Sequence, residues 1–173
     1  MKFLIIDTSG PDSFVCLWNH NRWKTKLLPP LKQSLTLLPA IQELLEGQTV
    51  DFIAIGTGPG SFTGTRVGVM TAKTLAFALK IPLLPFCSLK IYTPDEEGPF
   101  ILFSDAKSSG TFVLEGIRTS QTASFKQPYI KEGKKPLSKE LNLPFLGKYL
   151  LEKFLESGGR FSPEVQVCYL KTP

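Results

Sequence analysis

The stretch GPGSFTG, residues 58–64, links an apolar run predicted as a strand, Val50–Gly56, to a helix predicted from Thr65 to Lys80. Backbone N–H groups at the N-terminus of a helix can hold an anion, so this stretch is a candidate phosphate cradle. Its glycine spacing, however, matches neither Gly-x-x-x-x-Gly-Lys-Ser/Thr nor Gly-x-Gly-x-x-Gly. A tight turn in which Ser61 or Thr63 caps the helix explains the spacing better than phosphate binding does.

The helix after this stretch has an unusual distribution of side chains. Small residues recur every four positions on one face: Gly64, Gly68, Ala72 and Ala76. Basic residues recur every seven positions, beside Met70 and Phe77: Arg66, Lys73 and Lys80. A helix with so little polar surface is either sandwiched inside its own fold or meets a second protein. Because a chain of 173 residues has little material to cover both sides, we favour a partner interface.

The residues before the glycine stretch predict a β-meander followed by a helix. Three runs have the apolar or alternating pattern of strands, with turn-forming residues between them: Lys2–Asp7, Ser13–Trp18 and Arg22–Leu28. Apolar residues at helical spacing begin at Leu37 and end before Gly47. This predicted helix has Pro39 in its first turn, where proline is tolerated.

The residues after the second helix predict a smaller lobe. The polar segment Thr93–Pro99 is typical of a linker, so we divide the chain into an N-terminal lobe, residues 1–94, and a C-terminal lobe, residues 95–173. Residues 119–143 show no clear period. The other predicted elements are an edge strand at Ile81–Phe86, a hairpin of Phe100–Ser104 and Thr111–Ile117, a helix at Phe145–Leu155 and a closing strand at Val165–Leu170.

Composition narrows the environment of the protein. The chain is 42% hydrophobic, which suits a globular protein with a buried core. The run Phe3–Ile6 is too short for a secretory signal and no apolar run is long enough to span a membrane, so we expect a cytoplasmic protein. Three widely spaced cysteines, Cys16, Cys87 and Cys168, fit neither a disulfide framework nor a zinc knuckle, and we expect them to be reduced.

The net charge of +5 is concentrated in the second half of the chain. Between Arg118 and Lys153 there are eight basic residues against three glutamates. Such a segment could attract RNA through its phosphates, yet a solvated surface is the commoner origin of a lysine-rich stretch. No aromatic-interleaved RNA-binding signature accompanies these lysines, so we favour the solvated surface.

Few residues are available for catalysis. His20 is the single histidine and lies in a predicted hairpin turn, which leaves no histidine-based nucleophile pair and no metal cluster with histidine. Asp7 and Asp105 each close the first strand of a predicted lobe, where nucleotide- and Mg²⁺-handling enzymes place carboxylates. These carboxylates could equally bond the backbone N–H groups of their own loops. They are weak candidates for cofactor binding, in a small ATPase or phosphotransferase that would also use the glycine stretch.

Several motifs resemble the bacterial TsaB (YeaZ) family in order and spacing, and the glycine stretch is the most specific of them. The matching segments are IIDTS at 5–9, FVCLW at 14–18, residues 34–39, GPGSFTGTRVG at 58–68, DAK at 105–107 against the family's Asp-Ala-Arg, and YLK at 169–171 against its Tyr-Leu-Arg. The resemblance covers residues 1–117 well and after that only the end of the chain.

The resemblance implies an actin/Hsp70-like (ASKHA, ribonuclease-H-like) α/β fold with a mixed sheet and helices, a shortened second lobe and no catalytic competence. Members of the family pair with the related subunit TsaD and the ATPase TsaE. The assembly forms N6-threonylcarbamoyladenosine at position 37 of tRNAs that read codons beginning with A. TsaD carries the metal, in a His-x-x-x-His motif, and the transfer chemistry. We therefore expect ATP or ADP and metal in the partner subunits, contact with tRNA through the complex, and a possible homodimer when the chain is alone.

The resemblance also implies that the first two helices form the pairing surface. We predict a partner interface of Leu38, Ile41, Gln42, Leu45, Gly64, Arg66, Gly68, Val69, Met70, Ala72, Lys73, Ala76 and Phe77. Two departures from the family are visible: Gln33 stands where histidine is usual, and GTFV at 110–113 replaces the usual Glu-Val-Tyr. A peptidase function, suggested by an older label on relatives, is disfavoured because no nucleophile and base pair is available.

Overall fold

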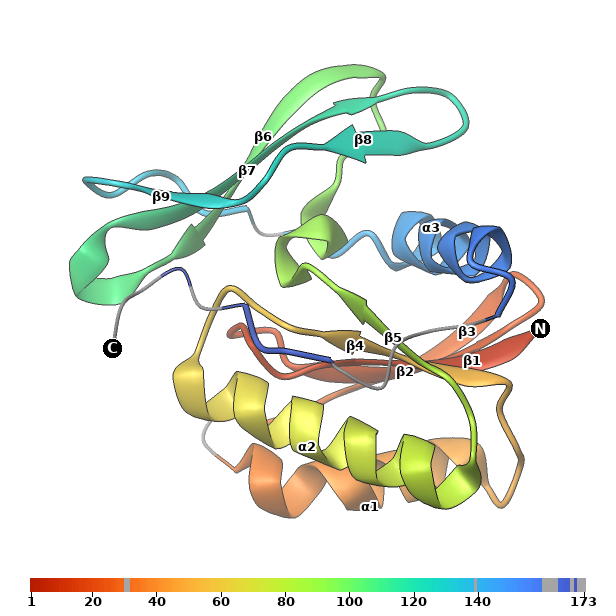
Figure 1. The fold of residues 1–173 in the computed structure, drawn as a ribbon. Helices are drawn as coiled ribbons and strands as arrows, with labels where there is room; N and C mark the ends of the chain where they lie inside the picture. Colours follow the sequence, from red (N-terminus) through yellow and green to blue (C-terminus); the bar gives the residue numbers. More distant parts are fainter. Residues whose placement is uncertain (30–31, 139, 160–164, 169, 171–173) are drawn as a thin grey trace.

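The computed structural model of the protein describes residues 1–29, 32–138, 140–159, 165–168 and 170. Its first sheet has the strand order β3-β2-β1-β4-β5, in which β2 is antiparallel to β1 and β3, while β4 is parallel to β1 and β5 (Figure 1). The predicted meander and the predicted edge strand are confirmed. The strands are β1 (Lys2–Asp7), β2 (Phe14–Asn19), β3 (Arg22–Leu27), β4 (Phe52–Gly56) and β5 (Leu83–Phe86).

The central strands β1 and β4 are buried on both faces, which explains why they are apolar throughout. Alternate side chains point to opposite sides of the sheet. Leu4 and Ile53 belong to the core cluster that the first two helices cover. Phe3 and Phe52 belong to the cluster on the opposite face, where the rings of this pair stack 4.3 Å apart.

Helices α1 (Gln33–Leu45) and α2 (Phe62–Leu79) lie side by side on one face of this sheet (Figure 1). Both begin three or four residues before their predicted starts at Leu37 and Thr65. Pro39 therefore lies inside α1, and its prediction in the first turn is wrong. Because Pro39 has no N–H, the carbonyl of Leu35 loses its hydrogen-bond partner in the helix. Leu35 and Pro39 are both exposed, so this interruption lies on the solvent side of the helix. The predicted end before Gly47 holds, with Glu46 in the left-handed conformation that ends the helix.

The second sheet forms above the first and contains the predicted hairpin (Figure 1). Its strands are β6 (Gly98–Asp105), β7 (Thr111–Arg118), β8 (Ala123–Phe125) and β9 (Tyr129–Lys131). The short strands β8 and β9, which the sequence pattern did not predict, both pair with β7. Three-residue strands carry too little periodicity to be recognised in the sequence, and their pairing with β7 stabilises them. A 3-10 helix at Ser88–Tyr92 connects the two sheets.

Helix α3 (Leu143–Glu156) returns to the first sheet and covers the face opposite α1 and α2 (Figure 1). Phe154 stacks on Phe52 with ring centres 4.0 Å apart. Gly147 lies against Trp18, because a Cβ on Gly147 would come 2.2 Å from the indole ring. The predicted helix is confirmed. It packs on the sheet of the N-terminal lobe, although the division after residue 94 assigned it to the C-terminal lobe.

The predicted closing strand at Val165–Leu170 is wrong where the structure describes it. Residues 165–168 are not in a strand, and the backbone N–H of Cys168 instead donates one hydrogen bond to the carbonyl of Thr57, 2.8 Å away. Val165 is buried in the core beneath α1 and α2, which accounts for its apolar character without a strand. Tyr169 and Lys171 of the C-terminal motif lie outside the described residues. No helix in the described part of the chain is long and apolar enough to cross a membrane.

Candidate functional site

The glycine stretch forms a sharp turn between β4 and α2, and its serine caps the helix. The hydroxyl of Ser61 accepts a hydrogen bond from the backbone N–H of Gly64 at 3.2 Å, and the carbonyl of Ser61 accepts one from the hydroxyl of Thr65 at 2.7 Å. Of the two predicted capping residues, Ser61 is therefore the cap. Gly58 adopts a φ of 92°, which an L side chain rarely adopts, so a glycine is favoured there.

The small residues of α2 face the protein's own fold. A Cβ on Gly60 would lie 2.2 Å from the carbonyl oxygen of Ser9, and one on Gly64 would lie 2.1 Å from that of Thr8. A Cβ on Gly68 would meet the hydroxyl of Thr8 at 2.2 Å. The predicted docking of a partner on this stripe is therefore wrong, because the turn after β1 covers Gly64 and Gly68, and Ala72 and Ala76 are buried in the core.

The backbone N–H groups of the glycine stretch bond to neighbouring parts of the chain. Gly58 donates to the hydroxyl of Ser88 at 3.0 Å, and Ser61 donates to the carbonyl of Ser9 at 2.6 Å. The hydroxyl of Thr8 in turn donates to the carbonyl of Gly64 at 2.7 Å. These bonds tie the loop to β1 and to the 3-10 helix, and the donors that they use do not point toward an open phosphate site.

Asp7 ends β1 in a buried position beside the glycine stretch. One carboxylate oxygen accepts hydrogen bonds from the backbone N–H and hydroxyl of Ser9, at 2.8 Å and 2.7 Å. The other oxygen, Oδ2, has no hydrogen-bond partner among the described residues, and a Cβ on Gly56 would lie 2.1 Å from it. Burial raises the pKa of Asp7 above its ordinary value, although the hydrogen bonds from Ser9 oppose the shift.

The cavity beside Asp7 is small, and Asp105 does not line it. Its volume is about 10 Å³, room for about one water molecule, whereas ligand pockets span about 300–1,000 Å³. Asp105 instead accepts a hydrogen bond from the backbone of Lys107 at 2.7 Å and pairs with its ammonium group at 3.0 Å. These hydrogen bonds hold the pKa of Asp105 below its ordinary value. The structure therefore does not join the two carboxylates in one nucleotide site. Among the described residues, no group of three His, Cys, Asp or Glu side chains could hold a metal ion.

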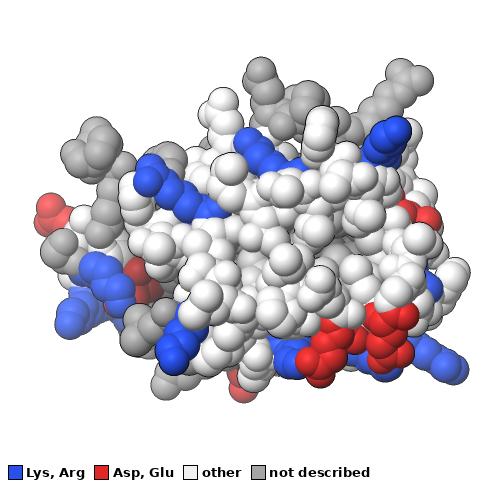
Figure 2. All heavy atoms as spheres, turned by 90° about the horizontal axis from the view of Figure 1, so that it is seen from below, with Lys and Arg blue, Asp and Glu red and all other residues white. Residues whose placement is uncertain are grey.

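The outer side of α2 exposes large apolar side chains. Phe77 is 87% exposed and Met70 is 62% exposed, and Phe62 is also exposed at the start of the helix. Leu35 and Leu38 of α1, the helix packed alongside α2, are also exposed. Figure 2 shows that the middle of this face is broad and uncharged, with charged side chains around it. We call these five residues the outer apolar face.

The predicted interface residues divide into two groups. Leu38, Gln42, Arg66, Met70 and Phe77 are exposed, and Leu45 and Lys73 are partly buried. Ile41, Gly64, Gly68, Val69, Ala72 and Ala76 are buried within the fold. The predicted set does not include the exposed residues Leu35 and Phe62, because the predicted helices began too late. The earlier glycine stretch contained the signal, since Phe62 directly follows the capping serine.

The guanidinium of Arg66 lies over the ring of Phe62, with its carbon 3.5 Å from the ring centre. Such a contact holds both side chains in place on the surface. Phe62 of the outer apolar face is therefore held by a neighbouring cation that is not itself one of the five apolar residues.

The remaining sequence candidates have structural explanations. His20 has a φ of 46° in the β2–β3 turn, where its ring nitrogens contact Asn19 and the N-terminal amine. Burial raises the pKa of Cys16 and that of Cys87 to about 11, so both thiols are poor nucleophiles. In the basic segment, Lys126 pairs with Glu115 and Lys153 with Glu156.

Comparison with known proteins gives a family match over most of the chain. The family model described as "TsaD: tRNA N6-adenosine threonylcarbamoyltransferase" matches residues 32–171. The proteins named "tRNA threonylcarbamoyladenosine biosynthesis protein TsaB" of Escherichia coli and Bacillus subtilis are 33% and 36% identical to the chain over 95 and 97 residues. These matches cover 51% and 52% of this chain but only 41% and 42% of the relatives. The chain thus matches about two fifths of the length of these curated relatives.

Solved structures show the same fold. A structure titled as an uncharacterized protein with similarity to peptidase YEAZ from Pseudomonas aeruginosa has a TM-score of 0.81 and 19% identity. A second, titled YeaZ from Pseudomonas aeruginosa, has a TM-score of 0.79 and 21% identity. Both alignments cover 98% of this chain and 99% of the solved chain. The predicted actin-like α/β fold is confirmed.

Proposed function

This chain belongs to the family that the TsaD model describes and, within it, to the TsaB (YeaZ) proteins, and on that basis we propose that it takes part in forming N6-threonylcarbamoyladenosine in tRNA. The names of the TsaB relatives support a role for the chain in this biosynthetic process. The target is position 37 of tRNAs that read codons beginning with A, as the family resemblance implies.

Within this process, the chain acts as a non-catalytic subunit that pairs with a TsaD-like protein, in an assembly that includes a TsaE-like ATPase. The observation that carries this role is the outer apolar face. Contiguous exposed apolar side chains on a monomer are typical of a protein interface. α2 buries its small residues inward and directs Met70 and Phe77 outward, so its outer side needs a partner. Without the TsaD-like subunit, the same face would pair with a second copy of the chain.

The candidate catalytic groups support a scaffold role. His20 lies in an exposed turn, and Asp105 is engaged by Lys107. Asp7 is buried beside a cavity that has room for about one water molecule. In this arrangement, ATP and metal would bind in the partner subunits.

Co-purification with the TsaD-like subunit tests the proposed interface. We expect Phe77→Glu and Met70→Glu each to abolish or strongly weaken the complex, because a charge would be buried against apolar surface. Leu155→Glu is the matched control, since Leu155 is 60% exposed, close to the 62% of Met70, and belongs to α3 on the opposite side of the sheet. Retention of the complex by both α2 variants would refute the interface. Gly68→Glu and Ala72→Glu are unsuitable, since they would disrupt the fold itself.

Measurement of the modified nucleoside tests the biosynthetic function. Depletion of the chain should lower threonylcarbamoyladenosine in tRNA, and expression of the wild-type chain should restore it. Phe77→Glu should fail to restore it, whereas Leu155→Glu should succeed. Turnover of Mg-ATP by the purified chain alone, lost in Asp7→Ala, would contradict a non-catalytic role.

A further inference from the structure

The segment from β5 to β6 and the segment from β9 to α3 both pass between the two sheets, and Asn142 hydrogen-bonds one to the other. Its backbone N–H donates to the carbonyl of Ile91 at 2.7 Å. Its side-chain amide donates to the carbonyl of Thr93 at 2.9 Å and to the carboxylate of Asp95 at 2.8 Å. Thr93 is fully buried. The segment predicted as a linker therefore begins as a fixed part of the fold.

A row of aromatic rings extends from the second sheet to α3. Phe100 of β6 contacts Phe125 of β8 with ring centres 5.8 Å apart, and Phe125 meets Tyr149 of α3 edge to face at 5.5 Å. Tyr149 in turn stacks on Phe145 at 5.8 Å. Aromatic pairs at such distances attract one another. The row therefore joins the second sheet to the helix that covers the first sheet.

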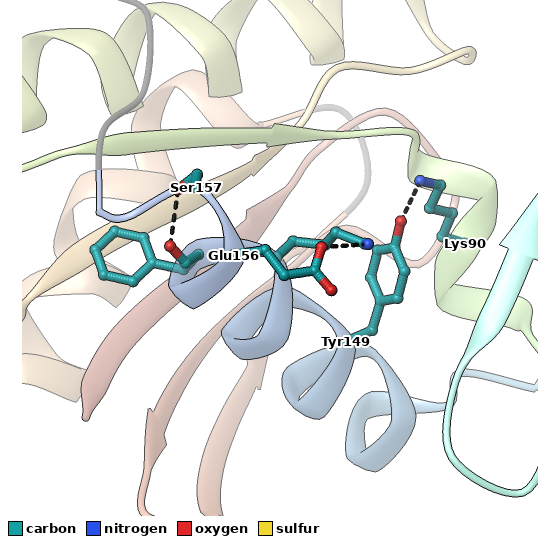
Figure 3. A network of polar contacts seen from close by, with 6 residues as sticks. Lys90, Tyr149, Glu156 and Ser157 are labelled. Carbon is teal, nitrogen blue, oxygen red and sulfur yellow. Dashed lines mark hydrogen bonds and ion pairs between the residues drawn. The ribbon is translucent and has the colours of Figure 1, made fainter.

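Lys90 and Arg118 add positive charge to this row from two further elements. The ammonium group of Lys90 lies 4.6 Å from the ring centre of Phe125 and 4.8 Å from that of Tyr149. It also donates a hydrogen bond to the hydroxyl of Tyr149 at 2.8 Å (Figure 3). The guanidinium carbon of Arg118, at the end of β7, lies 4.7 Å from the ring centre of Phe145. Among the described residues, no carboxylate pairs with Lys90, so the rings and the tyrosine hydroxyl stabilise its charge.

The backbone that carries Lys90 is held on both sides. Leu89 belongs to the buried cluster of the second sheet, whereas Ile91 belongs to the cluster between the first sheet and α3. The carbonyl of Lys90 accepts a hydrogen bond from the hydroxyl of Thr93 at 2.7 Å. The 3-10 helix therefore presents the ammonium group of Lys90 from a fixed position, at the point where β8 meets α3.

Linked lobes move relative to one another unless their interface is large and hydrophobic. We propose that Lys90 and Asn142 form a lock that holds the second sheet against α3, so that the two lobes move as one rigid body and do not open about the segment between them. The lock lies outside the outer apolar face, and its action does not depend on the TsaD-like subunit. With the lock closed, α1 and α2 belong to a body of fixed shape.

Residual dipolar couplings of the isotope-labelled full chain, weakly aligned in solution, test whether the lobes form one body. We expect a single alignment tensor to fit the amides of β1, β4 and α2 together with those of β6 and β7. A smaller alignment magnitude for the second sheet than for the first would overturn the proposal, because it would show that the lobes reorient independently.

Amide hydrogen exchange tests the part that Lys90 plays in the lock. Lys90→Met removes the charge and should speed exchange in residues 123–126 about tenfold, because loss of a partly buried cation–π contact favours local opening. Lys90→Arg keeps a cation and should exchange at nearly the wild-type rate. Lys153→Met is the matched control, since the ammonium group of Lys153 lies 5.7 Å from the same Tyr149 ring but pairs with Glu156 of its own helix. It should leave exchange in residues 123–126 unchanged.

Asn142→Asp tests the other half of the lock. Asp keeps an acceptor for the backbone N–H of Phe145, which Asn142 caps at 3.0 Å, but it has no N–H to donate to Thr93. We expect faster exchange of the Thr93 amide, while the first turn of α3 stays protected.

The comparison between variants decides whether the charge itself holds the lock. Equal exchange in residues 123–126 of Lys90→Met and Lys153→Met, or equally fast exchange in Lys90→Met and Lys90→Arg, would overturn the proposal. If Lys90→Met does not fold, Tyr149→Phe takes its place, since it removes only the hydroxyl that accepts from Lys90. Tyr149→Phe should also speed exchange in residues 123–126, and an unchanged rate would overturn the proposal.

Discussion

The turn after β1 passes so close to α2 that single atoms decide which residues are tolerated there. The carbonyl oxygens of Ser9 and Thr8 face Gly60 and Gly64 of the adjacent loop and helix, and the hydroxyl of Thr8 faces Gly68. Neither backbone can move away, because the hydroxyl of Thr8 and the N–H of Ser61 hydrogen-bond across the contact. These three glycines are therefore required by packing and not by a left-handed φ, which Gly58, earlier in the loop, adopts.

Gly64→Ala tests this packing, because it adds a single methyl group at the contact. The new methyl would lie 2.1 Å from the carbonyl oxygen of Thr8, so we expect a loss of about 1–3 kcal/mol or more in the free energy of unfolding. Thr74→Ala, on the exposed side of the same helix, should change it by about 0.5 kcal/mol or less. Chemical denaturation measures both, and equal stability of the two variants would show that the contact is not tight.

Asp7 should make stability fall as the pH rises. Its pKa in the folded state is raised above the ordinary value of 3.8, so the native protein binds more protons than the unfolded chain between the two pKa values. The contribution is fullest below the unfolded pKa and is lost as the pH rises through the folded pKa. Asp7→Asn keeps an acceptor for Ser9 and has no charge to bury. We expect this variant to flatten the decline in denaturation midpoint from acid to neutral pH, and an unchanged slope would contradict the assignment.

At the scale of elements, α2 carries small side chains on its buried side and large apolar side chains on its exposed side. Its buried side carries glycine and alanine, because the sheet and the turn after β1 come close to the helix axis. Its exposed side carries Phe62, Met70 and Phe77, which a helix at a free surface would not need. The large residues, rather than the small ones, therefore form the surface available to a partner.

The start of α2 depends on one hydroxyl group. Ser61→Ala removes the acceptor for the N–H of Gly64, so we expect a loss of about 1 kcal/mol in the free energy of unfolding. Thr63→Ala, two residues later on the same exposed turn, should cost less because Thr63 is not the cap. Thermal denaturation of the two variants checks this, and an equal or larger loss in Thr63→Ala would contradict it.

At the scale of the whole molecule, the two lobes do not separate cleanly in sequence. α3 follows the second sheet in the chain, yet it buries Phe3, Trp18 and Phe52 of the first sheet. Removal of these contacts would expose a large apolar area on the sheet. The N-terminal lobe therefore depends on the second half of the chain.

A fragment of residues 1–94 should consequently fail to fold on its own. We expect it to bind a hydrophobic dye and to lack the near-ultraviolet dichroism that fixed aromatic packing produces. The full chain should instead unfold in one transition by tryptophan fluorescence and far-ultraviolet dichroism. A folded fragment, or two separate transitions in the full chain, would show that the lobes are independent.

The sequence by itself determined the strands β1 to β5, the β6–β7 hairpin and the three helices, because side-chain periodicity and turn chemistry are local properties. It narrowed the cap of α2 to Ser61 or Thr63, and the structure chose Ser61. It also identified Met70 and Phe77, which the structure exposes. Local patterns cannot show which side of an almost wholly apolar helix is covered. That depends on how closely a distant segment approaches, as Thr8 approaches Gly64.

Only the tertiary structure decided the remaining features. The strands β8 and β9 exist because β7 provides their hydrogen-bond partners. Residues 165–168 are not a strand because Cys168 hydrogen-bonds to Thr57, in the loop after β4, and not to a neighbouring strand. α3 finds its place on the first sheet through Phe52 and Trp18, which lie far from it in sequence. Burial and pairing between distant segments set these outcomes, and no single window of sequence contains both partners.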